Sequence, residues 1–393
     1  MTEREKILQT LEAQNGVIFA EPEIVFRESY SGRDILAPNK AFTPDRTDER
    51  GYLPVERWVM SVTFAENPKF KEGEGLTKLR LVNGGHLQLR EALEICRVEL
   101  FGEQEFRWPL TKVLDIGGEP LETSFGTCEV PPIPCHVHGG DIVDGKPTGQ
   151  QGKREAYFFP PLDVPPYNKQ VEAITRLGVK ADATPEEFVE RMKRFGKDDS
   201  VYELLVEYPI KPYSGWTIYE RLIHAPGPWT TFEIQLPQDD FNLLSWRLGE
   251  RLDDVTEAKD EQLLRGLVDE EAVMREVIDW DASQDPNFEQ KYHHQIEILE
   301  EGGWGRRYRI FYDVFYGEGW EVETGASANF AAKDKPIAGF VWSGSGELNG
   351  TAFPQGAEFL ITPRTESQLT NTGATKLIIY TFEPLLEGVA PLG

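Results

Sequence analysis

The sequence predicts a mainly β protein with two jelly-roll barrels, helical elements at its N-terminus and a helical insertion. Short β-rich runs separated by Gly and Pro turns recur from Trp108 onward, which is the pattern of jelly-roll sheets. The length of 393 residues is too great for one ordinary core and indicates two domains. The expected strands cover residues 110–115, 157–159, 216–222, 230–236, 307–315, 320–324, 337–343, 358–362 and 375–382.

Helices are expected where apolar residues recur at helical spacing, as they do over residues 3–15 and 87–101. Thr184 can cap a helix that begins at Pro185 and ends near residue 195. Two further helices are expected over residues 169–177 and 251–277. We therefore assign residues 1–164 and 209–255 to a first barrel, residues 165–208 to a helical insertion, and residues 256–393 to a second barrel.

The charge of the chain argues against two classes of partner. The formal net charge is -26 and the sequence pI is about 4.7, so the surface repels nucleic acid and anionic membranes. No run of about 18 apolar residues is present to span a bilayer, and the N-terminus lacks the apolar segment of a signal peptide. Three cysteines form an odd, low count that fits a reducing compartment. A soluble, cytoplasmic protein is expected.

Two histidines one residue apart give the clearest chemical signal. On an extended strand, His136 and His138 project from the same face about 7 Å apart, where two imidazoles can converge on one metal ion. A carboxylate follows at Glu155. Cys135 precedes the pair and should face away, because adjacent side chains on a strand point to opposite faces. A His-x-His pair also occurs on ordinary surface strands, and this alternative stays open at this point.

Several short motifs follow one another in an order that resembles one enzyme family. They are Pro54–Trp58, Trp108–Asp115, Glu119–Leu121, Lys153–Ala156, His224–Ala225, Glu233, Asp239–Asp240 and Trp246–Gly249. In this order they resemble the type I mannose-6-phosphate isomerases of the cupin superfamily, over residues 54–255 and with a generic cupin following. The chain looks like a divergent member. It has His136 where the family has Gln, and Glu250–Leu252 where the family has Thr-Pro-Lys.

The resemblance implies a metal site and a reaction. It implies one divalent ion bound by His136, His138, Glu155 and His224, with zinc expected first and iron, manganese or nickel as alternatives. It also implies that Lys153 takes part in proton transfer, and that Arg247 contacts the reacting oxygens. The predicted function is the metal-dependent interconversion of an aldose and a ketose, with a small carbohydrate, phosphorylated or free, as the partner.

Other interpretations remain open. Lys153 could be an ordinary exposed lysine, and Arg247 could pair with Asp253 or Asp254. The ligand set also suits an Fe(II)-dependent cupin dioxygenase. A non-catalytic sugar-binding protein that kept the metal site is the third possibility. The sequence leaves monomer and homodimer equally open.

The remaining histidines and aromatic residues are assigned structural or packing roles. His86 is expected in a loop, and His293 and His294 should diverge on a strand and serve the structure. The aromatic residues of 308–320 are expected to fill a sheet core. The candidates for packing against a sugar ring are Tyr157, Tyr213 and Trp229.

Overall fold

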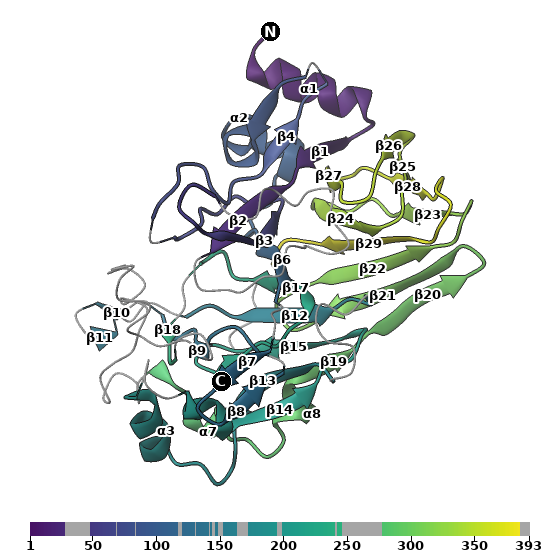
Figure 1. Ribbon diagram of the computed structural model, residues 1–393. Helices are drawn as coiled ribbons and strands as arrows, with labels where there is room; N and C mark the ends of the chain where they lie inside the picture. Colours follow the sequence, from purple (N-terminus) through teal and green to yellow (C-terminus); the bar gives the residue numbers. More distant parts are fainter. Residues whose placement is uncertain are drawn as a thin grey trace.

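The computed structural model confirms a mainly β architecture (Figure 1). It describes residues 1–27, 48–67, 69–82, 84–116, 120–129, 131–140, 142–143, 146–147, 152–162, 172–194, 199–239, 242–245 and 277–385. Arg247 and most of the helix expected over 251–277 lie outside these residues. Within them, no helix is long and apolar enough to span a membrane.

Two sheets form the barrel that carries the candidate site. The seven-stranded sheet has the order β19-β15-β12-β17-β6-β3-β2, and the five-stranded sheet has the order β14-β13-β16-β9-β18. The first sheet consists of β2 (Glu23–Arg27), β3 (Leu53–Val59), β6 (Leu110–Asp115), β12 (Glu155–Phe159), β15 (Ser214–Ile218), β17 (Thr230–Gln235) and β19 (His293–Gln295). The second consists of β9 (His136–Val137), β13 (Ile174–Val179), β14 (Leu205–Pro209), β16 (His224–Ala225) and β18 (Asn242–Leu243).

Two further sheets form the second half. The nine-stranded sheet has the order β20-β21-β22-β29-β24-β27-β1-β4-β5, and a four-stranded sheet has the order β23-β28-β25-β26. The nine strands are β1 (Val17–Glu21), β4 (Lys78–Arg80), β5 (His86–Gln88), β20 (Glu297–Gly302), β21 (Gly305–Phe311), β22 (Gly317–Val322), β24 (Ile337–Ser343), β27 (Glu358–Ile361) and β29 (Leu377–Phe382). The four are β23 (Ser327–Phe330), β25 (Gly346–Leu348), β26 (Thr351–Phe353) and β28 (Ser367–Thr370). Two small hairpins pair β7 (Leu121–Thr123) with β8 (Gly126–Cys128), and β10 (Ile142–Val143) with β11 (Lys146–Pro147).

The two halves exchange strands and share a core. β1 pairs with β27 and thereby joins the N-terminal segment to the second half, while β19 pairs with β15 of the first half. One apolar cluster contains Phe158 and Phe232 from the first half together with Phe340 and Tyr380 from the second. The domain boundaries given above stay a prediction.

Three helices form where the sequence predicts them. α1 (Glu3–Ala13) begins with a complete capping box between Thr2 and Glu5, and α2 is Leu89–Phe101. α3 (Pro185–Met192) is capped by Thr184 as expected. The short helices are η2 (Ser200–Leu204), α7 (Trp280–Ser283) and α8 (Phe288–Tyr292).

The prediction of a helix over residues 169–177 is wrong for residues 174–177, which the structure describes as a strand. Residues 174–179 form β13, in which Leu177 pairs with His224 and Arg176 with Ala225. The tertiary pairing outweighs the local helical spacing, because β13 supplies the backbone partner that β16 needs. The segment 165–208 is therefore part strand and part helix, and its strands belong to the barrel sheet.

Candidate functional site

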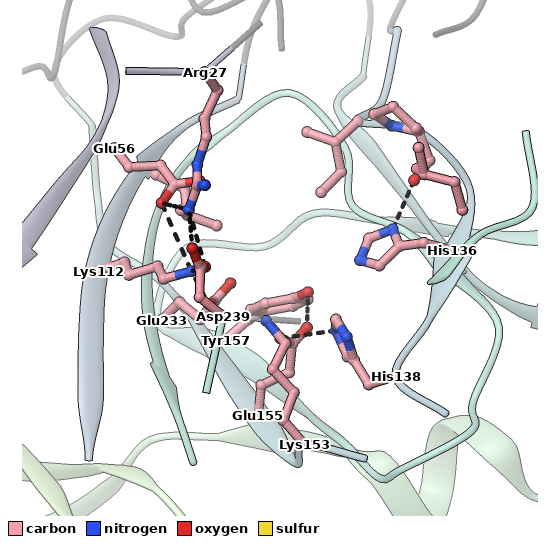
Figure 2. Close-up of a pocket in the computed structure, with 14 residues that line it drawn as sticks. Arg27, Glu56, Lys112, His136, His138, Lys153, Glu155, Tyr157, Glu233 and Asp239 are labelled. Atoms are coloured by element: carbon pink, nitrogen blue, oxygen red, sulfur yellow. Dashed lines mark hydrogen bonds and ion pairs between the residues drawn. The ribbon is translucent and has the colours of Figure 1, made fainter. Parts of the chain in front are cut away.

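Four predicted side chains converge in the first barrel. His136 and His224 are directly opposite each other on β9 and β16 of the five-stranded sheet, and His138 follows β9. Glu155 begins β12 on the other sheet. The ligand atoms of the three imidazoles lie within 4.8 Å of one another. Glu155 Oε2 lies 3.1 Å from His138 Nε2 (Figure 2). Glu155 Oε1 lies 3.2 Å from His224 Nε2.

The backbone fixes the tautomers of two of the imidazoles. Nδ1 of His136 lies 2.6 Å from the Pro134 carbonyl, and Nδ1 of His224 lies 2.8 Å from the Leu222 carbonyl. A carbonyl can only accept, so each Nδ1 carries a proton, and in the neutral ring the lone pair is then on Nε2. This is the orientation of imidazole ligands in metal sites.

The contact between His224 and Glu155 is one that a cation can bridge. Nε2 of His224 is buried, and the carboxylate oxygen Oε1 of Glu155 lies 3.2 Å from it. In the neutral imidazole that a metal ion needs, this Nε2 and the oxygen are both acceptors, and a bound cation would lie between them. Ligand atoms bound tetrahedrally at about 2.0–2.1 Å from a zinc ion are about 3.3 Å apart. The observed spacing therefore fits a divalent metal ion.

The protonation states also fit a metal ion. Burial, followed by the neighbouring His224 and His138, holds the pKa of His136 well below its usual range. Burial and then Lys153 lower the pKa of His138 to about 3. Burial alone would raise the pKa of Glu155, but His138 and Lys153 hold it well below its usual range. These imidazoles are therefore neutral and Glu155 is ionised at neutral pH, as metal ligands must be.

Lys153 is buried, so the alternative that it is an ordinary exposed lysine is wrong. Its Nζ donates to Gln235 Oε1 at 2.9 Å and lies 3.4 Å from Glu155 Oε2.

Cys135 is a free, buried cysteine that packs in an apolar cluster with Val137 and Phe188. It faces away from His136 as predicted, and burial raises the pKa of its thiol. The placement of Arg247 lies outside the described residues.

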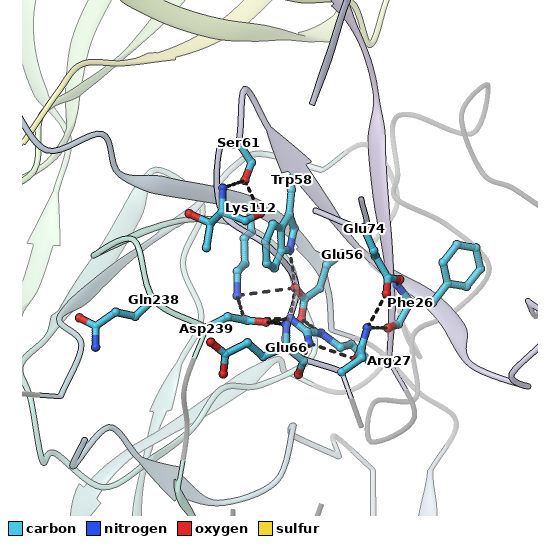
Figure 3. Close-up of polar contacts among 12 residues, drawn as sticks. Phe26, Arg27, Glu56, Trp58, Ser61, Glu66, Glu74, Lys112, Gln238 and Asp239 are labelled. Atoms are coloured by element: carbon cyan, nitrogen blue, oxygen red, sulfur yellow. Dashed lines mark hydrogen bonds and ion pairs between the residues drawn. The ribbon is translucent and has the colours of Figure 1, made fainter. Parts of the chain in front are cut away.

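The sequence reasoning missed a group of charged residues that line the same cavity. We call Arg27, Glu56, Lys112 and Asp239 the charge-paired wall (Figure 3). Arg27 Nε donates to Glu56 Oε1 at 2.9 Å, and Arg27 Nη2 donates to Asp239 Oδ1 at 2.9 Å. Lys112 Nζ donates to Asp239 Oδ1 at 3.0 Å. The signal available in the sequence was Lys112 itself, a lysine within a predicted strand that also carries Leu110, Val113 and Leu114.

The charges of the charge-paired wall neutralise one another. Burial raises the pKa of Asp239, but Arg27 and Lys112 outweigh it and hold that pKa well below its usual range. Burial likewise opposes the charge on Lys112, but Asp239 and Glu56 raise the pKa of this amine. Glu233 stands beside the wall with its Oε1 4.0 Å from Lys112 Nζ, and burial and then Glu155 raise its pKa to about 8. The wall thus brings two cations and two carboxylates to the cavity, in addition to Lys153, Glu155 and Glu233.

The arrangement of strands matches solved structures over almost the whole chain. A mannose 6-phosphate isomerase from Bacillus subtilis has a TM-score of 0.59 at 19% identity, covering 93% of this chain and 99% of that one. A proposed mannosephosphate isomerase from Archaeoglobus fulgidus has a TM-score of 0.60 at 16% identity, covering 94% and 97%. The fold is that of the mannose-6-phosphate isomerases.

A zinc-bound mannose 6-phosphate isomerase also has the same fold, at a lower sequence identity. Its TM-score is 0.57 at 9% identity, and the match covers 94% of this chain and 100% of that one. No family model and no curated protein sequence matches the chain. The mannose-6-phosphate isomerase fold is thus established by structure, and the resemblance in motif order agrees with it.

The other predicted residues occupy varied places in this mannose-6-phosphate isomerase fold. Tyr157 lines the cavity, but its hydroxyl donates to Glu155. Tyr213 donates instead to Glu321 at 2.9 Å, and the indole of Trp229 donates to the Pro160 carbonyl at 3.0 Å. Neither of these two lines the cavity. The expectation for His86 is wrong, because it lies on β5 rather than in a loop.

The adjacent histidines of β19 have structural contacts, as expected. The ring of His293 lies 4.7 Å from that of Trp216, and His294 Nε2 lies 2.9 Å from Thr217 Oγ1. Burial lowers the pKa of His294 to about 4. The expectation that the aromatic residues of 308–320 fill a core is confirmed for Tyr308, Phe311, Phe315 and Trp320, which are buried, whereas Tyr312 and Tyr316 are only half-buried.

Proposed function

We propose that this protein is a metal-dependent enzyme that interconverts an aldose and a ketose. The observation that carries the proposal is the convergence of three buried imidazoles and Glu155 in the first barrel. The contact between His224 Nε2 and Glu155 Oε1 supports it, because a cation can bridge these two atoms. The fold supports it as well, since it is the fold of enzymes named for this reaction.

The ion would be held by His136, His138, Glu155 and His224. When bound, a divalent ion polarises a carbonyl and stabilises the negative charge of an enediolate. Three neutral imidazoles and one carboxylate suit zinc, and geometry alone also admits iron, manganese or nickel. Zinc is our first choice.

The chain supplies two groups that can exchange a proton beside this site. Lys153 Nζ is held by Gln235 and lies 3.4 Å from Glu155, so it borders the site from the segment that precedes β12. Glu233 has a pKa of about 8, which suits a group that gives and takes a proton near neutral pH. We assign the transfer between adjacent carbons to Lys153, with Arg247 contacting the reacting oxygens. Glu233 is the alternative proton carrier.

The charge-paired wall would orient the hydroxyl groups of the substrate. Its carboxylate oxygens keep lone pairs, and its amine and guanidinium are fixed by their ion pairs. Fixed donors and acceptors lose little entropy when they bind hydroxyl groups. The cavity holds about 30 Å³, room for one or two water-sized groups, so the reacting end of a carbohydrate would enter rather than the whole molecule.

The proposal is tested with purified, zinc-loaded protein and a panel of free and phosphorylated hexoses and pentoses. We expect stoichiometric zinc and isomerisation of at least one sugar. Lys153→Met should lower kcat by at least a hundredfold and keep the zinc, whereas Lys211→Met, at an exposed lysine, should change neither. Turnover of no sugar on the panel would remove the proposal.

Two other outcomes point to the alternative functions. Iron in place of zinc, together with consumption of oxygen, would identify a cupin dioxygenase. Sugar binding without turnover, unchanged by Lys153→Met, would identify a binding protein. Metal content, oxygen consumption and sugar binding are each measured separately from turnover.

A further inference from the structure

The alternation of β12 brings a tyrosine to the metal-facing side of the barrel. Glu155 and Tyr157 are two residues apart on this strand and therefore project from the same face. Both line the cavity, whereas Ala156 and Phe158 pack in the shared apolar core on the other face. The phenol of Tyr157 is thus placed beside the carboxylate by the strand itself.

The phenol donates its hydrogen bond to one oxygen of the carboxylate. Tyr157 Oη donates to Glu155 Oε1, the oxygen that lies 3.2 Å from His224 Nε2. The other oxygen, Oε2, lies 3.1 Å from His138 Nε2 and 3.4 Å from Lys153 Nζ. Each oxygen of Glu155 therefore has its own neighbours, and rotation of the carboxylate would exchange them.

The tyrosine ring is itself immobilised. Tyr157 is only 2% exposed and packs in an apolar cluster with Leu177, Trp216 and Ile218. Its backbone pairs with Trp216 on one side and with Glu233 on the other. A hydroxyl group on a ring packed in this way has a fixed position, so its hydrogen bond constrains the carboxylate rather than following it.

From this geometry we propose that Tyr157 is a positioning residue for the metal centre. It holds Glu155 in one orientation, in which the carboxylate faces the imidazoles, and it donates to the ionised form that binds a cation. Residues that orient a metal ligand in this way contribute 10- to 100-fold to metal affinity. This inference rests on the proposed metal site. It replaces the role of Tyr157 in packing against a sugar that the sequence indicated.

The chain offers a matched control. Tyr213 Oη also donates to a buried carboxylate, Glu321 Oε1, at 2.9 Å, and Glu321 lies on β22 in the other half of the molecule. Tyr157→Phe and Tyr213→Phe each remove one phenol–carboxylate hydrogen bond and keep the ring. Only the first should change the metal site if Tyr157 acts through Glu155.

The experiment measures zinc affinity by competition with a chromophoric chelator, and the absorption spectrum of the cobalt-loaded protein. We expect Tyr157→Phe to weaken zinc binding 10- to 100-fold and to alter the cobalt spectrum, which reports ligand geometry. We expect Tyr213→Phe to leave zinc affinity within about twofold and the spectrum unchanged. Thermal unfolding of the apoproteins measures any general destabilisation separately.

The outcomes separate the two proposals. Wild-type affinity and spectrum in Tyr157→Phe would overturn the positioning role and leave the metal site standing. Equal losses in both variants would overturn it too, because they would indicate a general structural effect. A wild-type protein that binds no zinc would remove the metal site and the positioning role together.

Discussion

The proton balance of metal binding gives a sharp test of the proposed centre. An imidazole binds a metal ion only when it is neutral, so every protonated ligand releases its proton when zinc binds. Burial and Lys153 lower the pKa of His138 to about 3, and burial with the other imidazoles holds the pKa of His136 well below normal. Both residues should therefore already be neutral at pH 6 in the apoprotein.

The expected difference is large enough to measure. An imidazole with an ordinary pKa of about 6.5 is about three-quarters protonated at pH 6, so three such ligands would release about 2.3 protons. Here His136 and His138 should release none, so at most one of the three imidazoles can release a proton. A zinc-bound water with a pKa of about 7 adds about 0.1 proton at this pH. The total should therefore stay near or below one proton per zinc.

The assay is isothermal titration of the apoprotein with zinc at pH 6 in two buffers that differ in ionisation enthalpy. The dependence of the observed heat on the buffer gives the number of protons released. Lys153→Met removes the cation that helps to lower the pKa of His138, so this variant should release more protons than the wild type. Release of two or more protons by the wild type would refute the reasoning.

Three further predictions concern other parts of the chain. Arg57→Met should lower the free energy of unfolding by about 3–5 kcal/mol in urea titrations, because it leaves Glu358 unpaired and fully buried between the two halves; a loss under 1 kcal/mol would contradict this. Asp239→Asn should leave zinc affinity within threefold but lower kcat/KM at least tenfold, because Asp239 orients both cations of the wall; unchanged kinetics would show that the wall does not contact substrate. A thiol reagent should label none of the three buried cysteines in the folded protein and all three in guanidinium; labelling of Cys135 in the native state would place it at an accessible site instead.

Local signals predicted those parts of the fold whose structure depends on nearby residues. Leu110–Asp115 and Ile337–Ser343 form strands with the bounds that alternation and flanking turns indicated. Thr184 caps a helix that begins at Pro185, since the cap and the fixed backbone angle of proline act within one turn. Residues 174–177 were assigned to a helix and form a strand, because their pairing with His224 and Ala225 joins segments far apart in the chain.

The sequence by itself determined which side chains could serve as metal ligands. The His-x-His spacing, the order of the motifs and the small number of histidines were sufficient to name the four residues that converge. The tertiary structure alone decided what surrounds them. Arg27, Glu56 and Asp239 lie on segments distant in sequence, and only the curvature of the barrel brings their charges to the cavity opposite the imidazoles. Ion pairing and burial depend on contacts between segments that are distant in sequence. A local sequence pattern therefore cannot predict which carboxylate stays ionised or which amine pairs with it.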